Sequence, residues 1–157
     1  MKYKYILFDL DGTITESGPG IMNSVEYALN KMNREVGDRD TLKKFIGPPL
    51  TESMEKYYGM SKEEALLGVK YYREYYAVKG IFENSVYEGL AETLEFLKNE
   101  GYILAVATSK PEEYAKRIAD KFDFAKYFAG IYGATMDGSL IRKADVIRYA
   151  LDNLGVE

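Results

Sequence analysis

Three short and almost wholly apolar runs stand out along the chain, and a polar residue or a glycine follows each of them. They cover Tyr5 to Phe8, Tyr102 to Ala107 and Phe128 to Tyr132, and they are followed by Asp9, Thr108 and Gly133. Short runs without polar alternation are typical of strands that are buried on both faces of a parallel sheet. The pattern therefore predicts three such strands.

Helical stretches alternate with these runs. They are expected at Ala91 to Lys98, at Glu112 to Phe122 and at Ala144 to Leu154. Strand and helix in alternation indicate α/β winding around a parallel, Rossmann-like sheet, in which ligands gather at the carboxyl ends of the strands. This predicts where a site would lie.

The long interval from Ile14 to Phe82 contains helical periodicity and no convincing strand. Its apolar residues recur at helical spacing, and its breaks fall at Gly37, at Gly47-Pro48-Pro49 and at Gly59. We therefore predict an α/β core formed by residues 1–14 and 82–157, with a helical cap inserted at 15–81. The tyrosines at 57, 58, 71, 72, 75 and 76 of this insertion are interpreted as a packing face of a helical bundle rather than a base-stacking platform.

The composition excludes several kinds of chemistry. The 157 residues include no cysteine and no histidine, and 21 basic against 25 acidic residues give a net charge of −4. Disulfides, thiol nucleophiles, Ser-His triads and imidazole or thiolate metal ligands are thereby excluded. Catalysis would have to use carboxylates, lysine, Ser/Thr or tyrosine.

Charge and hydropathy also bear on partners and location. The acidic balance without a basic cluster argues against a nucleic-acid partner. Asp9 interrupts the N-terminal apolar run before a signal-peptide core could form, and no apolar run approaches the ~20 residues of a membrane span. We expect a cytoplasmic protein with no membrane partner.

The first candidate site is the segment Asp9-Leu10-Asp11-Gly12-Thr13, directly after the first run. Side-chain alternation points Asp9 and Asp11 to the same side, where their charges repel unless a hard cation lies between them or one carboxyl is protonated. Both arrangements are used in phosphoryl chemistry, and Gly12 would let the backbone approach a phosphate. The alternative is an Asp-Gly turn whose acids merely cap and solvate a loop.

Two further candidate segments follow the other predicted strands. Ser109 and Glu112 fit a capping box, while the same helix start, with the Thr108 hydroxyl, could bind an anion. Arg142 and Lys143 lie in the first turn of the last helix, where cations oppose the helix dipole, and this placement indicates an anionic partner. The alternative for this pair is two solvated surface charges.

Taken together, these segments resemble the haloacid dehalogenase superfamily, phosphatase branch, with a helical cap after the first motif. Asp9 to Thr13 matches the first motif, Thr108 the second and Lys143 the third, in the family's order. Segments 46–50, 107–111 and 143–147 are further similar to phosphoglycolate phosphatases and 5'-nucleotidases.

The resemblance implies a mechanism and a set of ligands. Asp9 would be the nucleophile, forming an aspartyl-phosphate, and Asp11 the acid and base, with Mg²⁺ on the Asp9 carboxylate and the Asp11 backbone carbonyl. Thr108 and Lys143 would hold the phosphate, with Gly12 and Ser109 as further substrate contacts. The substrate would be a small phosphorylated metabolite. Asp11 favours phosphoester hydrolysis, because a dehalogenase needs no acid there.

One part of the family pattern is missing. The fourth motif, an acidic segment that completes the magnesium shell, would follow the helix that ends near Leu154, and the sequence given ends at Glu157. We therefore expect a fragment whose core is incomplete at the C-terminus and whose first strand is an exposed edge.

Three other functions stay open at this stage or are set aside. A phosphomutase of the β-phosphoglucomutase type would share every motif, and a truncated chain could bind phosphate without turnover. A response-regulator receiver domain would need a phosphorylatable aspartate at the end of a strand before Thr108, and the region from Gly47 to Gly59 offers no such strand.

Overall fold

A computed structural model describes residues 4–156, and the chain divides into two compact units. The first unit joins the two ends of the chain, up to Glu16 and from Val86 onward, and the second is the continuous segment Ser17–Ser85. Two short strands, β2 (Thr15–Glu16) and β3 (Ser85–Val86), lie where the chain passes from one unit to the other. A two-residue strand carries no periodicity, which is why the sequence pattern missed β2. The predicted domain limits at 15 and 81 stay a prediction.

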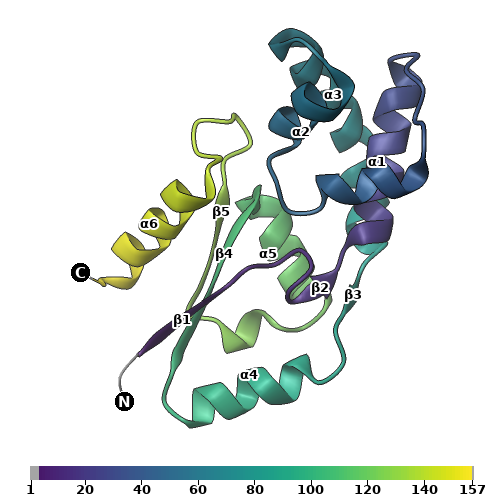
Figure 1. The fold of residues 1–157 in the computed structure, drawn as a ribbon. Helices are drawn as coiled ribbons and strands as arrows, with labels where there is room; N and C mark the ends of the chain where they lie inside the picture. The colour runs from purple at the N-terminus through teal and green to yellow at the C-terminus, as the bar shows by residue number, and fades with distance from the viewer. Residues whose placement is uncertain (1–3, 157) are drawn as a thin grey trace. The chain divides into compact units, whose positions relative to one another are not determined.

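The first unit is built on a three-stranded parallel sheet in the order β1-β4-β5 (Figure 1). Its strands are β1 (Tyr5–Phe8), β4 (Ile103–Pro111) and β5 (Gly130–Ala134). In the register Leu7 lies opposite Ala105, and Ala105 lies opposite Gly130. The prediction of a parallel α/β core is confirmed.

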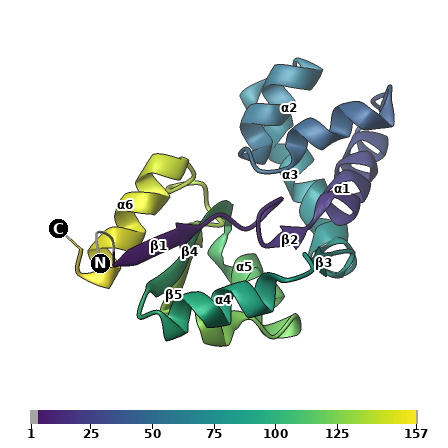
Figure 2. The ribbon, with the colours of Figure 1, turned by 60° about the horizontal axis from the view of Figure 1, so that its bottom comes forward.

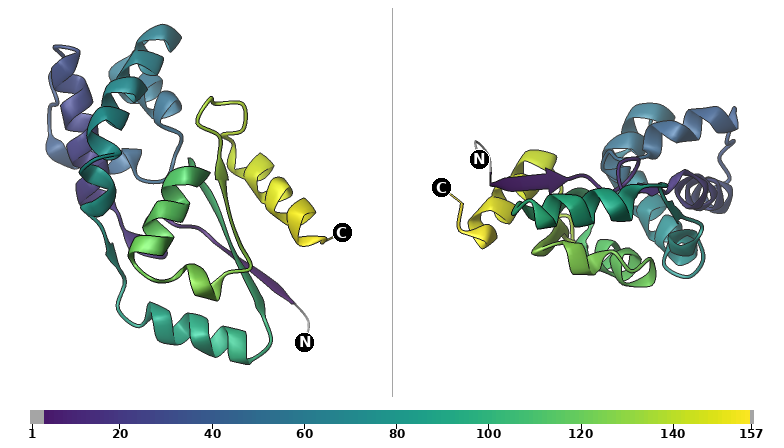
Figure 3. Two further views of the ribbon diagram at one scale, coloured as in Figure 1. Left: turned by 180° about the vertical axis from the view of Figure 1, so that it is seen from behind. Right: turned by 90° about the horizontal axis from the view of Figure 1, so that it is seen from below.

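Three helices surround this sheet. Helices α5 (Glu112–Lys121) and α6 (Lys143–Leu154) pack against β4 and β5 from opposite faces (Figures 1 and 3). Helix α4 (Leu90–Asn99) contacts β4 and the 3₁₀ helix at Ala125–Tyr127 (Figure 2). The middle of β4, from Leu104 to Ala107, is buried, which explains its run of apolar residues without alternation.

Helix α5 begins at Glu112 as predicted, but the predicted capping box between Ser109 and Glu112 is wrong. Strand β4 continues to Pro111, which pairs with Ala134 after a register shift, and α5 begins at Glu112 without a side-chain cap. Ser109 therefore lies in a strand and not at a helix cap. The reason is the pairing with β5, which keeps the chain extended, while the Glu112 carboxylate accepts from Gly133 N and Lys116 Nζ.

The third strand is also displaced by two residues from its predicted place. Phe128 closes the turn of the 3₁₀ helix, where its N–H donates to Ala125 O at 3.1 Å, so β5 begins only at Gly130 and includes Gly133. Apolar content alone does not distinguish the end of such a turn from the start of a strand.

The second unit is helical, as predicted. It contains α1 (Gly18–Lys31), α2 (Leu50–Tyr58) and α3 (Lys62–Tyr76), with 3₁₀ helices at Arg39–Phe45 and Gly80–Phe82. Helix α3 packs against both α1 and α2. A capping box between Ser61 and Glu64 begins α3, and Gly59 ends α2 in the left-handed conformation.

The tyrosines of this unit divide between core and surface. Tyr72 and Tyr76 are buried and stack with ring centroids 5.2 Å apart, so for them the prediction of a packing role is confirmed. Tyr57 is exposed, at 38%; the Lys44 and Lys56 ammonium groups lie over its ring, and the ring also lies 6.0 Å from that of buried Phe45. Adjacent tyrosines on a helix cannot all point to one side.

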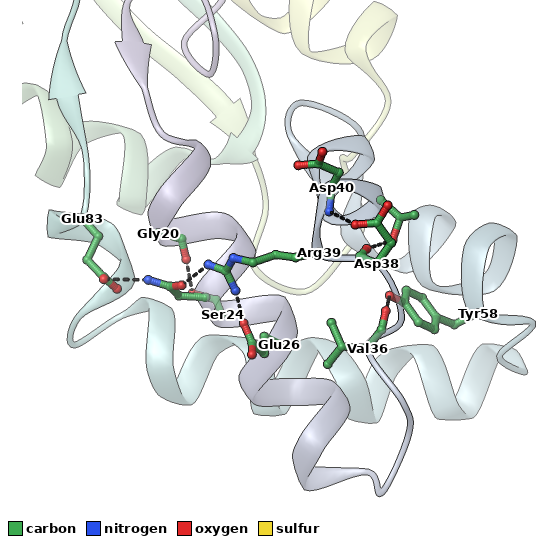
Figure 4. Close-up of polar contacts among 11 residues, drawn as sticks. Gly20, Ser24, Glu26, Val36, Asp38, Arg39, Asp40, Tyr58 and Glu83 are labelled. Atoms are coloured by element: carbon green, nitrogen blue, oxygen red, sulfur yellow. Dashed lines mark hydrogen bonds and ion pairs between the residues drawn. The ribbon is translucent and has the colours of Figure 1, made fainter.

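A polar network fastens the 3₁₀ segment to α1 in this unit (Figure 4). Arg39 contacts Glu26 and Asn23, and Asn23 Nδ2 in turn donates to Glu83 Oε2 at 2.7 Å. A hydrogen bond to Glu83 raises the pKa of Tyr75. Helix α1, the 3₁₀ segment and the end of α3 are thus joined by side chains as well as by apolar packing.

Within residues 4–156 we find no helix long and apolar enough to cross a membrane.

Candidate active site

The acidic segment forms a tight loop immediately after β1. The carbonyl of buried Leu10 accepts the N–H groups of Thr13, Ile14 and Thr15 at 3.2, 2.9 and 3.2 Å. Gly12 has φ +77°, a conformation that favours glycine, and its N–H already donates to Thr15 O at 2.8 Å. Gly12 therefore shapes the loop, and its backbone donor is engaged within it.

Asp9 and Lys143 meet at the carboxyl end of the sheet. Lys143 Nζ lies 2.7 Å from Asp9 Oδ1 and 2.6 Å from the carbonyl oxygen of Ala107. Leu10 N donates to the same carboxylate oxygen at 2.8 Å. Oδ2 takes part in neither contact, and both side chains are about 40% exposed. The structure thus holds one oxygen of Asp9 and presents the carboxylate to solvent.

Packing of α6 on the sheet puts Lys143 in this place. Val146 and Ala150 are fully buried against Ala107. The carbonyl of Ala107 also accepts the hydrogen bond from Lys143 Nζ. Lys143 is the first residue of α6, where its charge opposes the helix dipole. The Asp9 carboxylate is therefore an anionic partner of Lys143, the kind of partner that this placement indicated. Arg142, which occupies the N-cap position, is exposed.

Asp11 is paired with a different lysine. Lys110 Nζ lies 3.1 Å from Asp11 Oδ1, and the two side chains are only 5% and 6% exposed. Oδ1 is buried and accepts no hydrogen bond of regular geometry among residues 4–156, so the contact is one of charge rather than of a directed hydrogen bond. Buried charges require partners of opposite charge, and here Lys110 and Asp11 are partners of each other.

Sequence reasoning missed Lys110. The expected capping box made residues 109–112 a helix start, in which Lys110 had no reason to point into the site. A signal was present: Lys110 follows the apolar run closely, two residues after a candidate site threonine, and a lysine that is buried is almost always paired.

Thr108 lies beside Lys110 on β4. Its hydroxyl oxygen accepts the N–H of Lys110 at 3.1 Å, and the residue is 1% exposed. That bond uses the oxygen as an acceptor and leaves the hydroxyl proton for an anion. Ser109 is half-buried, and its side chain makes no hydrogen bond to Asp9 or Asp11 within the described chain. The structure thus brings together Asp9 with Lys143, and Asp11 and Thr108 with Lys110.

The two carboxylates lie in different environments. Asp9 is 40% exposed and Asp11 6%, although only Leu10 separates them in the sequence. Two carboxyl groups in unlike environments can divide nucleophilic and acid–base roles between them. The two lysines also offset the repulsion that the acidic pair would otherwise suffer.

Oxygen atoms of this loop are of the kind that a magnesium ion binds. Residues 4–156 contain no group of three or more acidic side chains gathered closely enough to hold a metal by themselves. Mg²⁺, however, is commonly held by one or two carboxylates, with waters and substrate phosphate completing six oxygen ligands. The Asp9 carboxylate and the Asp11 backbone carbonyl are donors of the required kind.

Comparison with known proteins places this site in context. A family model described as haloacid dehalogenase-like hydrolase matches residues 6–157. The chain is 42% identical over 156 residues to a 5'-nucleotidase of Pseudomonas aeruginosa, covering 99% of this chain and 71% of that protein. It is 40% identical over 150 residues to tyrosine-protein kinase PtkA of Mycobacterium tuberculosis, covering 95% of this chain and 50% of the kinase.

A solved structure shows the same fold. The crystal structure of a predicted phosphatase from Clostridium acetobutylicum superposes with a TM-score of 0.96 at 48% identity, covering 99% of this chain and 72% of that one. The chain thus spans about seven tenths of this structure and of the Pseudomonas relative, and half of the kinase.

Proposed function

The chain belongs to the haloacid dehalogenase-like hydrolase family, and we propose that it hydrolyses small phosphomonoesters by way of a phosphoryl group held transiently on Asp9. The resemblance expressed by the three sequence motifs is thereby confirmed. Family and relatives make the chain a phosphatase. The proposal concerns its catalytic residues, its metal and its substrate class.

The observation that supports this mechanism best is the contrast between the two carboxylates. Asp9 is half-exposed, with Oδ1 held by Lys143 and Leu10 N and Oδ2 outside those contacts, as a nucleophile requires. Asp11 is buried beside Lys110, where it can exchange a proton away from bulk water. The acid–base role therefore falls to Asp11 in a chain without histidine.

The reaction runs in two balanced steps. Asp11 enters the first step protonated: Asp9 attacks phosphorus, the ester P–O bond breaks, and the leaving oxygen takes the proton of Asp11, which is left as the carboxylate that pairs with Lys110. Asp11, now ionised, accepts a proton from water as that water attacks the aspartyl-phosphate and releases inorganic phosphate with Asp9. Both residues return to their starting states.

Other residues stabilise the charge that develops on the transferred group. The Thr108 hydroxyl and the Lys143 ammonium donate to phosphoryl oxygens, and such donors act most strongly in the transition state. The Asp9 carboxylate and the Asp11 carbonyl would hold Mg²⁺, which when bound supplies further charge neutralisation. Ser109 and Gly12 are proposed as substrate contacts, Gly12 because its missing side chain lets the backbone come close to a phosphate.

The proposed substrates are a nucleoside 5'-monophosphate or phosphoglycolate. The relative in Pseudomonas aeruginosa is named 5'-nucleotidase, and the sequence resembles both substrate classes of the family. We therefore propose a small phosphorylated metabolite as the partner, with no nucleic-acid or membrane partner. We also propose that the protein acts in the cytoplasm.

Replacement of the nucleophile tests the proposal. Phosphate release from p-nitrophenyl phosphate, a nucleoside 5'-monophosphate and phosphoglycolate is measured with and without Mg²⁺ for the wild type, Asp9→Asn and Asp123→Asn. Asp123 is a matched control because its side chain is 82% exposed in the same unit. We expect Asp9→Asn to keep its circular dichroism spectrum and lose nearly all turnover, and the control to keep its activity. Comparable turnover in Asp9→Asn would exclude it as nucleophile.

Product analysis separates the neighbouring activities. Release of inorganic phosphate as the main product excludes a phosphomutase. Transfer from ATP to a tyrosine-containing peptide, without phosphate release from monoesters, would favour the activity in the name of the mycobacterial relative. A chain that binds phosphate and releases none would be a binding module.

A further inference from the structure

We infer that Lys110 is a positioning residue that acts through Asp11: its buried ammonium orients the carboxylate that serves as acid and base. The inference rests on the proposed function and extends it to a residue outside the three family motifs.

Burial makes this pair unusual in the site. Lys110 and Asp11 are 5% and 6% exposed, whereas Lys143 and Asp9 are 39% and 40% exposed. Breaking a buried pair by removing one partner leaves an uncompensated charge, which is strongly unfavourable. The Asp11 carboxylate therefore depends on Lys110 for its position far more than the Asp9 carboxylate depends on Lys143.

The contact between the two side chains is short and is one of charge. Asp11 Oδ1 lies 3.1 Å from Lys110 Nζ but accepts no hydrogen bond of regular geometry within residues 4–156. Charge attraction holds the carboxylate in its direction. The oxygen is thus fixed in place.

The backbone of Lys110 is itself fixed. Its N–H donates to Thr108 Oγ1 at 3.1 Å, and its carbonyl lies so near Gly133 that a Cβ there would be 2.6 Å away. A side chain that starts from a fixed backbone and ends in a buried ion pair has few conformations left. The Lys110 ammonium is therefore held in one position, beside the Asp11 carboxylate.

The same facts argue that Lys110 does not bind the substrate phosphate directly. Its side chain is 5% exposed and its ammonium faces Asp11, whereas Lys143 offers a half-exposed ammonium next to the nucleophile. The two lysines would then have separate roles, one on the transferred group and one through the acid.

Leaving-group dependence distinguishes these roles. The value of kcat/KM reports the step that breaks the ester bond, and an aryl phosphate with a good leaving group needs little help from an acid there, whereas an alkyl phosphate needs much. For Lys110→Met we expect kcat/KM to fall about 100-fold on ethyl phosphate and less than about tenfold on p-nitrophenyl phosphate. The inhibition constant of inorganic phosphate should stay within about twofold, because binding is not affected.

Two further proteins complete the design. Lys116→Met removes an exposed lysine, 56% accessible and paired with Glu112 at 2.8 Å, and should behave as wild type. The double variant Asp11→Asn/Lys110→Met should match Asp11→Asn within about twofold, because the lysine acts through a carboxylate that is already gone. The double variant also removes both buried charges, so it serves even if Lys110→Met alone does not fold.

Several results would overturn the inference. Equal loss on the alkyl and aryl substrates would do so, as would a rise of more than about tenfold in the inhibition constant of phosphate, or a further large loss in the double variant. If the wild type releases no phosphate from either ester, the proposed function fails first, and the role of Lys110 fails with it.

Discussion

Lys143→Met should separate stability from activity. The lysine makes a 2.7 Å ion pair with Asp9 and a 2.6 Å hydrogen bond to Ala107 O, but at 39% exposure. Half-exposed pairs of this kind contribute ~0.2–1 kcal/mol, and one hydrogen bond about 1 kcal/mol. Removing a cation from a helix N-terminus returns ~0.3–1 kcal/mol. The free energy of unfolding should therefore fall by about 1 kcal/mol.

The same substitution should be far more damaging to turnover. Loss of one preorganised donor to the charge of a transition state costs about 10²–10³ in kcat, which is ~3–4 kcal/mol. Methionine keeps the length and the apolar stem of the lysine, so the packing of α6 should be preserved. Activity and stability thus change by amounts that differ several-fold in free energy.

Two assays measure the difference. Urea unfolding followed by circular dichroism gives the free energy of unfolding, and phosphate release from p-nitrophenyl phosphate with Mg²⁺ gives kcat, each with Lys116→Met as the control. A folded Lys143→Met protein that keeps more than about a tenth of wild-type kcat would refute the assigned role. A loss of more than about 3 kcal/mol in unfolding free energy would instead make Lys143 a structural residue.

Three further predictions concern the surroundings of the site. Gly133→Ala should lower both kcat and the midpoint of thermal unfolding, because its Cβ would lie 2.6 Å from Lys110 O and 2.7 Å from Glu112 N; equal values for variant and wild type would contradict this packing. Hydrogen bonds from the hydroxyl and N–H of Ser139 lower the pKa of Asp137 from 3.8 to about 2, so their stabilising effect is complete above pH 3.8 and is lost as the pH falls through about 2. In a carbon-13 NMR titration, Ser139→Ala should move this pKa back towards 3.8. Chelation by EDTA should abolish phosphate release and Mg²⁺ should restore it, whereas unchanged activity in EDTA would exclude the metal.

The sequence predicted those parts of the molecule that depend on local pattern. Strand β1 and the loop after it could be predicted because a short apolar run that stops at Asp-x-Asp-Gly is typical of a parallel strand followed by an acidic turn. Its predicted burial on both faces is wrong, because β1 ends the sheet of the described residues and is half-buried. Helix α6 and its N-terminal Lys143 followed from helical periodicity after a glycine turn. Each of these features is decided within about a dozen neighbouring residues.

The features that escaped prediction depend on distant residues. Strand β4 extends to Pro111 because β5 pairs with it, and the Glu112 side chain turns to Gly133 rather than to Ser109. Local capping preferences are weak against such tertiary contacts. The pairing of Lys110 with Asp11 is of the same kind, since about a hundred positions separate the two residues in the sequence.

The ends of the helical unit are tied to each other, and this has a consequence for how the chain folds. Gly20 N donates to Glu83 O at 3.1 Å, and Asn23 Nδ2 donates to Glu83 Oε2. Strand β1 must find β4 across the whole of that unit, a search whose entropic cost grows with the length of free chain between them. Once the helical unit has collapsed and its ends are joined, the free chain between the two strands is little more than the loop after β1 and the stretch that carries α4. We therefore expect the helical unit to form early and Asp9, the proposed nucleophile, to reach its final environment late, when β1 docks.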